Sequence, residues 1–225
     1  MEKCHPTITP IASDIKKCYW ILKFTKMKSI ISLIFIIAFF LQPTLVFGQK
    51  HYQSGYIITT NNDTIPGQVK DRKPQPFGKL YKKIRFKDKK FVRRKYGVHQ
   101  IAGYKQGGNQ FESLWIDVSQ NLFKQNYTSA PNSGKKYFLK VVYRGYLTYY
   151  HWEFQDHESG YIDKIDLFKR EGESSFVRVT QGILGLKKKR LAEYFQDCPE
   201  LVFKIENGEI KYPVEIANFY NRNKK

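Results

Sequence analysis

The chain has 225 residues, of which 41% are hydrophobic and 16% aromatic, a composition typical of a globular protein and not of a disordered chain. Its 39 lysines and arginines against 20 acidic residues give a net charge of +19. Such an excess predicts anionic neighbours, either nucleic acid, phospholipid headgroups or acidic polysaccharide. Charge alone does not choose among these partners, whereas the compartment of the protein does.

The N-terminal segment has the plan of a secretory signal peptide. From Met27 it reads MKSIISLIFIIAFFLQPTLVFGQ, in which a lysine precedes an apolar run over residues 30–41. This run is well short of the ~20 residues that a membrane-spanning helix needs. We therefore predict export, with cleavage between Gly48 and Gln49. Residues 1–26 are a poor leader, so translation is expected to start at Met27 and the signal peptide to cover residues 27–48.

An uncleaved N-terminal anchor is the alternative, because residues 45–47 extend the apolar stretch past a break. Cleavage would discard Cys4 and Cys18 and leave Cys198 alone, and one thiol cannot form an intrachain disulfide. Most of the basic residues lie after the signal peptide. The positive charge is therefore a property of the predicted folded part, residues 49–225.

The mature chain opens with a predicted β-hairpin. Residues 56–60 and 64–69 are rich in Ile, Thr and Val, and Asn61-Asn62-Asp63 between them are turn-forming residues. Pro66 lacks an amide hydrogen, so we expect the second strand at a sheet edge. Because the loop lacks the glycine and the glutamate of an EF-hand, we predict a turn and no calcium site.

Two more strand pairs follow. Residues 79–95 place Ile84 and Phe86 on one face and Arg85 and Lys87 on the other, which predicts a hairpin with one charged face. Residues 101–105 and 110–116 predict the next pair. The Gly-Gly turn between them lacks the lysine and the following helix of a phosphate-binding loop.

The remaining β segments are separated by polar residues. Residues 120–136 are polar and are predicted to form an exposed excursion. Residues 137–154 predict two strands bent around Gly145, and Tyr150, Trp152 and Phe154 should share one face of the second strand. Shorter strands are expected over 160–168 and 176–179.

The hydrophobic period changes to that of a helix after residue 185. Leu191 and Phe195 mark a first helix, Asp197 is expected to cap a second, and Pro213 to open a third. The predicted fold class is α+β: a β-rich body of antiparallel hairpins at residues 49–182, with a small C-terminal helical cap at residues 183–225 packed on the same domain.

Several segments together resemble a known family. GYIITTNNDTIPGQV, KIRFKD, YGVHQIAGYKQGGNQFES, RGYLTYYHWEF and YFQDCPELVFKIENGEI with VEIANFYN follow a secretory signal. This order resembles a family of secreted or envelope proteins of Gram-negative bacteria whose function is uncharacterised. The resemblance covers nearly all of the mature chain and implies export and architecture. It implies no activity, cofactor or active site, because the matching residues are turn formers, strand aromatics and a helix cap.

The segment HWEFQDHES gathers acidic residues and histidines, which are the residue types of a catalytic or metal site. His151 and Glu153 should share a strand face with Asp156 nearby, which keeps a hydrolase or transferase as the alternative function. His157 lies across a turn, and the spacing provides no third metal ligand. We therefore assign no catalytic residue, metal or cofactor, and favour a solvated strand end.

The basic hairpin carries the leading functional hypothesis. Between residues 79 and 95 only Asp88 opposes the positive charge, and aromatic residues are interleaved. The predicted anion-binding residues are Lys82, Lys83, Arg85, Lys87, Lys89, Lys90, Arg93 and Arg94. For an exported chain, nucleic acid is disfavoured, and the expected partner is an anionic lipid, lipopolysaccharide, an acidic glycan or an envelope protein. The alternative is a solvated face that binds no partner and whose charge discourages aggregation through the sheet edge.

Overall fold

The structure is a computed structural model that describes residues 52–73, 78–90, 92–121 and 124–224. The chain divides into two units, residues 1–49 and 50–225, and all described residues belong to the second. The predicted leader, the signal peptide and the cleavage site at Gly48 and Gln49 lie outside the described residues. No helix in the described ranges has the length and apolar character required to span a membrane.

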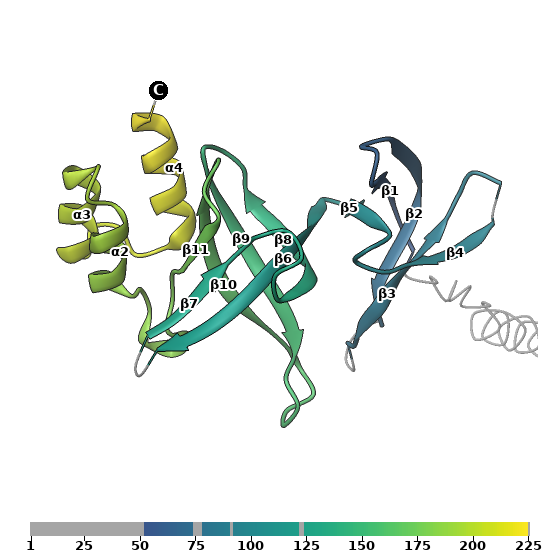
Figure 1. The fold of residues 1–225 in the computed structure, drawn as a ribbon, viewed down its shortest axis with the longest axis horizontal. Helices are drawn as coiled ribbons and strands as arrows, with labels where there is room; N and C mark the ends of the chain where they lie inside the picture. Colours follow the sequence, from purple (N-terminus) through teal and green to yellow (C-terminus); the bar gives the residue numbers. More distant parts are fainter. Residues whose placement is uncertain (1–51, 74–77, 91, 122–123, 225) are drawn as a thin grey trace, which may run out of the picture. The chain divides into compact units, whose positions relative to one another are not determined.

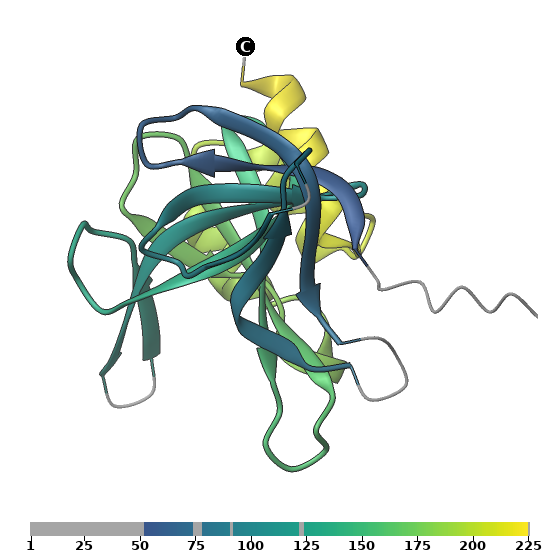
Figure 2. The same cartoon turned by 90° about the vertical axis from the view of Figure 1, so that its right-hand side faces the viewer.

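Strands precede helices along the described chain (Figures 1 and 2). The strands are β1 (Gln53–Thr59), β2 (Thr64–Arg72), β3 (Leu80–Lys87), β4 (Arg93–Tyr96), β5 (Ile101–Gln106), β6 (Asn109–Asn121), β7 (Lys124–Thr128), β8 (Lys135–Tyr143), β9 (Leu147–Gln155), β10 (Ile162–Arg170) and β11 (Ser175–Arg178). The helical elements are η1 (Gly182–Leu184), α2 (Lys188–Tyr194), α3 (Pro199–Glu206) and α4 (Pro213–Asn223). The prediction of a β-rich chain that ends in helices is confirmed.

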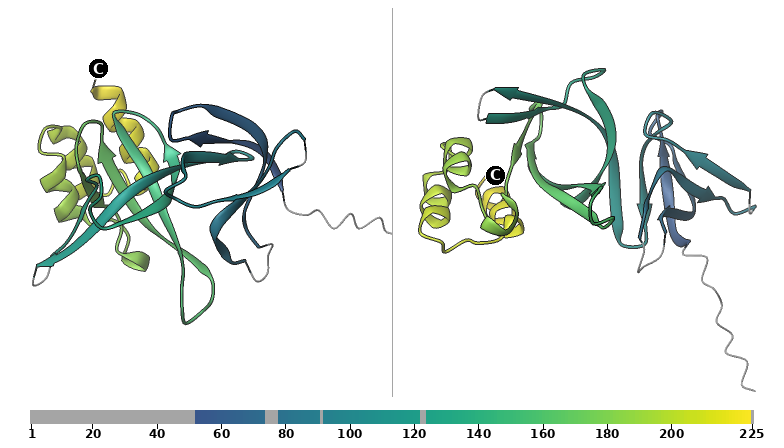
Figure 3. Two further views of the ribbon diagram at one scale, coloured as in Figure 1. Left: turned by 45° about the vertical axis from the view of Figure 1, so that its right-hand side comes forward. Right: turned by 90° about the horizontal axis from the view of Figure 1, so that it is seen from below.

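All described strands join one antiparallel sheet. Their order is β4-β3-β2-β1-β5-β6-β7-β11-β10-β9-β8. The last strand in this order, β8, also pairs with β6, and this pairing closes six strands into a barrel. The ring can be followed in the right panel of Figure 3. Closure leaves the barrel strands without free edges, apart from the places where a strand is short.

Strand β6 belongs to both parts of the sheet. Residues 109–112 of β6 pair with β5, and residues 117–121 pair with β7. Residues 110–116 pair with β8. This single strand of 13 residues therefore leads from the open sheet of β1–β5 directly into the barrel.

The buried side chains form three clusters that follow the alternation along the strands. Tyr149 and Tyr150 are neighbours in β9 and point to opposite faces. Tyr150 packs inside the barrel, whereas Tyr149 packs outward against the helices. A further cluster covers one face of the open sheet, with Ile57, Val69, Ile84, Phe86, Ile101, Tyr104 and Phe111 as its buried members.

The opening hairpin forms as predicted, but its second strand lies inside the sheet. The N–H of Thr59 donates to the carbonyl of Asp63 at 2.8 Å, and Asn62 adopts a φ of 67°, so this segment is a turn. Strand β2 pairs with β1 and with β3, which makes the edge position expected from Pro66 wrong. The ladder with β3 reaches only to Gln68, so the missing N–H of Pro66 lies beyond it.

The polar segment 120–136 contains a strand that the sequence did not predict. Strand β7 pairs with β6 on one side and with β11 on the other, so it is part of the barrel wall. Among its described side chains only Tyr127 is buried. One apolar side chain in a short polar segment gives too weak an alternation to indicate a strand.

Asp197 does not cap the second helix. The residue at the N-cap of α3 is Cys198, and it makes no side-chain capping bond. The Asp197 carboxylate instead accepts hydrogen bonds from Arg170 at 2.7 Å and from the hydroxyl of Tyr220 at 2.6 Å. It therefore ties α4 to β10, a long-range role that outweighs the local capping preference.

Candidate anion-binding surface

The register of β2, β3 and β4 sorts the basic residues by face. Ile84 and Phe86 are buried in the open-sheet core, so the alternate side chains of β3 point to the opposite face. The pairings of β3 with β2 and β4 extend that face across three strands. We define the outer basic face as Lys70, Lys83, Arg85, Lys87, Arg93 and Lys95.

The other predicted anion-binding residues lie elsewhere on the hairpin. Lys82 lines a cavity on the inner side of the sheet. Arg94 lies directly opposite the buried Phe86 and so belongs to the inner face at the sheet edge. Lys89 and Lys90 are exposed on the turn between β3 and β4. The structure thus places half of the predicted set on one common face.

Like charges oppose one another directly on the outer basic face. Arg85 is paired in register with Lys70 on one side and with Lys95 on the other. In the next row, Lys87 is opposite Arg93. Like charges at directly opposed positions of an antiparallel pair destabilise the sheet. This repulsion is a cost that a bound anion would relieve.

The three cations of the central row are not paired with carboxylates in the part of the chain that the structure describes. Within the described ranges, no ion pair joins Lys70, Arg85 or Lys95 to an acidic residue. Asp88, the opposing acid predicted from the sequence, accepts the N–H of Val92 at 2.9 Å and so stabilises the turn. These three residues of the face therefore keep their positive charge without a carboxylate partner among the described ion pairs.

One aromatic residue supports the basic face. The guanidinium of Arg85 lies 4.3 Å from the centre of the Tyr81 ring. Such a cation–π contact orients the guanidinium without neutralising it. Arg85 is thereby held in the middle of the row while its donors stay available to an anion.

The three residues of the alternative hydrolase site are not brought together. The Glu153 carboxylate accepts a hydrogen bond from Arg72 at 2.8 Å. Asp156 accepts the backbone N–H of Ser159 at 3.0 Å and organises the β9–β10 turn. His151 instead meets Asp166, whose Oδ1 lies 3.2 Å from the His151 Nε2. The described contacts of these side chains thus provide no shared acid–base pair.

Asp166 is the centre of a polar cluster that sequence reasoning missed. Its carboxylate accepts the hydroxyl of Tyr149 at 2.7 Å and the hydroxyl of Thr180 at 2.7 Å. Burial would raise the pKa of Asp166, but hydrogen bonds from His151, Tyr149 and Thr180 outweigh burial and hold the pKa well below its usual range. The Lys164 ammonium, 3.7 Å away, acts in the same direction.

The partners of Asp166 argue for a structural role. Burial, with the hydrogen bond to the carboxylate, raises the pKa of Tyr149 far above its usual value, so this phenol stays protonated and is no base. Both carboxylate oxygens are occupied by protein hydroxyls. The cluster links β9 and β10 with the segment after β11, and this structural role accounts for the cluster without a catalytic function.

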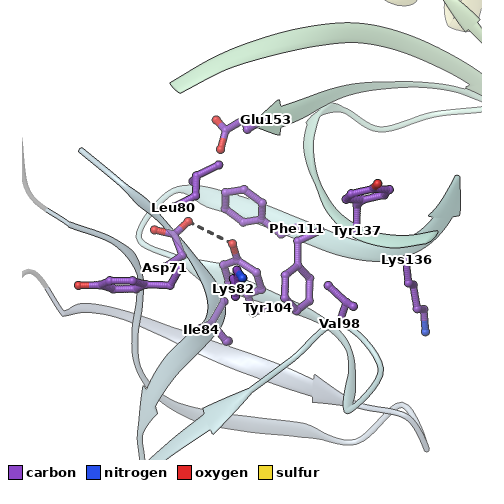
Figure 4. A pocket seen from close by; sticks show the side chains of 12 residues that line it. Asp71, Leu80, Lys82, Ile84, Val98, Tyr104, Phe111, Lys136, Tyr137 and Glu153 are labelled. Carbon is purple, nitrogen blue, oxygen red and sulfur yellow. Dashed lines mark hydrogen bonds between the residues drawn. The ribbon is translucent and has the colours of Figure 1, made fainter. Parts of the chain in front are cut away.

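A second carboxylate is buried beside a cavity of about 260 Å³. Asp71 is 3% exposed, and its carboxylate accepts hydrogen bonds from Nε and Nη2 of Arg72 at 3.0 and 2.9 Å. The Tyr104 hydroxyl donates to it at 3.1 Å, as Figure 4 shows. With its amide nitrogen facing the carboxylate, Gln106 donates to Oδ1 at 2.6 Å.

Tyr104 and Glu153 line this cavity together with Asp71 and belong to the same polar network. Burial, together with the Asp71 charge, raises the pKa of Tyr104 well above its usual value. Arg72, Tyr104 and Gln106 therefore all carry protons that they donate in hydrogen bonds to the Asp71 carboxylate. Arg72 then extends the network to Glu153 of β9, because its Nη2 contacts both carboxylates. This is a fully satisfied buried polar network of the kind that fixes a unique packing.

No cluster of three or more metal-ligating side chains occurs within the ranges that the structure describes. The sequence could have indicated two of the residues that it missed. Lys70 follows the period of two from Gln68, and Asp71 follows Val69 onto the buried face. Asp166 gave no such signal, because its partners lie on three separate segments.

No protein-family model, no curated protein and no solved structure matches this chain. The resemblance to secreted proteins of Gram-negative bacteria therefore stays a prediction. The fold and the surface nevertheless define a class: a β-rich protein with a closed antiparallel barrel, C-terminal helices and an open sheet whose outer face is cationic.

Proposed function

We propose that the protein is an exported, non-catalytic binding module that attaches to an anionic component of the cell envelope through the outer basic face. The observation that carries the proposal is the row Lys70, Arg85 and Lys95, three cations in register on adjacent strands. A charged face that served only to prevent aggregation would not require cations at directly opposed positions, where they repel one another.

The spacing of the sheet suits a surface with repeated negative groups. Neighbouring strands lie about 4.8 Å apart, and alternate residues on one strand about 7 Å apart. The outer basic face therefore presents a lattice of cations at the spacing of phosphate or carboxylate groups on a crowded surface. Phospholipid headgroups, the phosphates of lipopolysaccharide and acidic glycans all have this chemistry. An acidic envelope protein is the remaining partner.

Export is the second half of the proposal. It is supported by the sequence of residues 27–48, which precede the folded part. In the cytoplasm the same surface would meet nucleic acid first, because nucleic acid is the dominant polyanion there. Outside the cytoplasm, lipid and glycan anions take that place.

The test compares two variants with equal loss of charge. In the first, Lys83, Arg93 and Lys95 of the outer basic face are changed to Gln; all three are exposed, so the fold should be retained. Each basic residue near an anionic membrane contributes about 1 kcal/mol. We expect roughly hundredfold weaker binding to phosphatidylglycerol vesicles in a sedimentation assay.

The matched control changes Lys189, Lys211 and Arg222 to Gln, which removes the same charge from exposed sites on or near the helices. Its vesicle binding should stay close to that of the unchanged protein. Equal losses in both variants would show that net charge alone acts, and would refute a defined surface. Acidic polysaccharide in place of vesicles identifies which anion is preferred.

A further inference from the structure

A cavity of about 700 Å³ lies where the barrel wall is incomplete. Strand β11 has four residues and pairs with β10 only at Leu167 and Phe168, and with β7 only at Tyr127 and Thr128. Within the described chain, β7 and β10 continue past these pairs without a strand between them. The β6–β7 and β9–β10 hairpins, which both extend downward in Figures 1 and 2, frame the opening.

One wall of this cavity is apolar and aromatic. The side chains come from β6, β7, β9 and β10, and they continue the packed interior of the barrel to its mouth. They are Val118, Tyr127, Trp152, Phe154 and Ile165. A cavity of this size with an apolar wall and a few polar groups is the usual form of a small-molecule site.

Two carboxylates also reach the cavity, and both are engaged by the protein. Asp166 binds the hydroxyls of Tyr149 and Thr180. Asp163 accepts the backbone N–H of Lys164 at 2.7 Å. Both oxygens of Asp166 are thus occupied, whereas the exposed Asp163 accepts this one bond at Oδ1.

Three cations from different elements lie near one another beside the end of β11, and Arg178 among them lines the cavity. Arg178 is the last residue of β11. The N–H of Lys187 donates to the carbonyl of Val179 at 2.9 Å, which fixes Lys187 beside the end of β11. Arg190 follows in α2 and donates to the side chain of Asn126 in β7 at 3.3 Å.

These cations lack anionic partners. In the ranges that the structure describes, none of the ion pairs includes Arg178, Lys187 or Arg190. The Nε of Arg190 is buried with no hydrogen-bond partner there. Burial lowers the pKa of Lys187, and the charges of Arg178 and Arg190 lower it further. The buried unsatisfied donor of Arg190 and the mutual repulsion of the three cations are both costs that an anion would remove.

We propose that this cavity binds an amphipathic anion: a carboxylate or phosphate head group held by Arg178, Lys187 and Arg190, on an apolar body that lies against Trp152 and its neighbours. Both halves of the ligand are needed. An inorganic anion would leave the aromatic wall exposed, and a neutral apolar molecule would leave the three cations unpaired. The site shares no residue with the outer basic face, so it stands independently of the proposed attachment to the envelope.

The binding test uses ligands that separate the two halves. The purified protein is titrated calorimetrically with decanoate and with decyl phosphate, and then with decanol and with acetate. We expect either amphipathic anion to bind at least tenfold more tightly than decanol or acetate, because a charge-assisted hydrogen bond is worth about that factor. The nuclear magnetic resonance signal of the Trp152 indole N–H should shift on binding. The tighter of the two anions identifies the head group.

The variants test the cation cluster. Arg178→Gln and Lys187→Gln should each weaken decanoate binding roughly tenfold, whereas Arg178→Lys, which keeps the charge, should lose less. Lys189→Gln, an exposed neighbour on α2, is the matched control and should bind as the unchanged protein does. Circular dichroism confirms that each variant is folded.

Three results would overturn the proposal. If decanol bound as tightly as decanoate, the cations would not contribute to binding. If acetate bound as tightly as decanoate, the apolar wall would not contribute. Binding without a shift of the Trp152 indole would place the ligand elsewhere. The variant of Lys83, Arg93 and Lys95 should keep decanoate binding, so a failure of the envelope proposal and a failure of this one give different results.

Discussion

Asp166 shows how one buried carboxylate stabilises the region where the barrel meets the segment after β11. It is 8% exposed and receives hydroxyl donors from two segments of the chain. A carboxylate with these donors is more stable ionised than protonated, so its contribution to folding depends on pH. Asp71 is also buried, in the open sheet, where an arginine, a phenol and an amide donate hydrogen bonds to it.

The pKa of Asp166 predicts a pH effect. The folded-state pKa lies below the ordinary 3.8, so the stabilisation is complete above about pH 4 and is lost as the pH falls below that value. Asp166→Asn should lower the free energy of unfolding by about 2 kcal/mol at pH 7. Urea denaturation should show a smaller difference between the two proteins at pH 3.

Asp163→Asn is the control for this prediction, because Asp163 is an exposed carboxyl on the same strand. It should change stability at pH 7 by less than half as much. A difference between Asp166→Asn and the unchanged protein that stays constant from pH 7 to pH 3 would contradict the assigned ionisation.

At the scale of elements, an arginine attaches the helices to the barrel. Arg170 of β10 donates to the carbonyl of Tyr194 at 2.6 Å and to Asp197 at 2.7 Å. Its guanidinium also lies 4.3 Å from the ring of Tyr194 and 5.2 Å from the ring of Tyr220. One planar cation thus contacts the end of α2, the turn before α3 and the face of α4.

Arg170→Lys tests whether this planar geometry matters. A lysine keeps the charge but cannot donate in a fork or stack on two rings, so we expect a loss of about 1–3 kcal/mol in the free energy of unfolding. Thermal denaturation followed by circular dichroism measures it. Arg222→Lys on the exposed side of α4 should leave the transition unchanged. Faster hydrogen exchange confined to the helices would locate the effect.

The elements were predictable from the sequence to different degrees. Strands with clear alternation, such as β3 and β9, and helices that begin at a proline, such as α4, follow from local rules. Strand β7 did not, because it is short and polar and is fixed by its two neighbours. The edge position predicted from Pro66 was wrong for a similar reason. The hydrogen-bonded ladder can stop short of a proline while the strand itself continues inside the sheet.

At the scale of the molecule, neither the closure of the barrel nor the outer basic face could be derived in full from the sequence. Closure depends on the pairing of β6 with β8, which no local pattern encodes. The charged side of the β3–β4 hairpin was predicted from alternation, but the contribution of Lys70 depends on the register with β2. Long-range register is the information that a single sequence lacks.

Arg72 connects the two parts of the sheet, and this connection can be measured. Its guanidinium joins Asp71 in β2 to Glu153 in β9. A double-mutant cycle with Arg72→Met and Glu153→Gln should give a coupling energy of about 1 kcal/mol in urea denaturation. Arg72→Met combined with Asp163→Asn, which has no such contact, should be additive. An additive result for the Arg72 and Glu153 pair would mean that the contact does not hold the parts together.

The short β11 also sets the order in which the barrel can assemble. It is made after every other strand of the ring, and it joins β7 to β10, two strands that do not otherwise pair in the described chain. During synthesis the barrel therefore cannot close until β11, its last and shortest strand, has left the ribosome. Contacts between segments so distant along the chain form slowly. Until then the barrel interior stays open on one side, and that is the state in which the nascent protein most needs protection from aggregation.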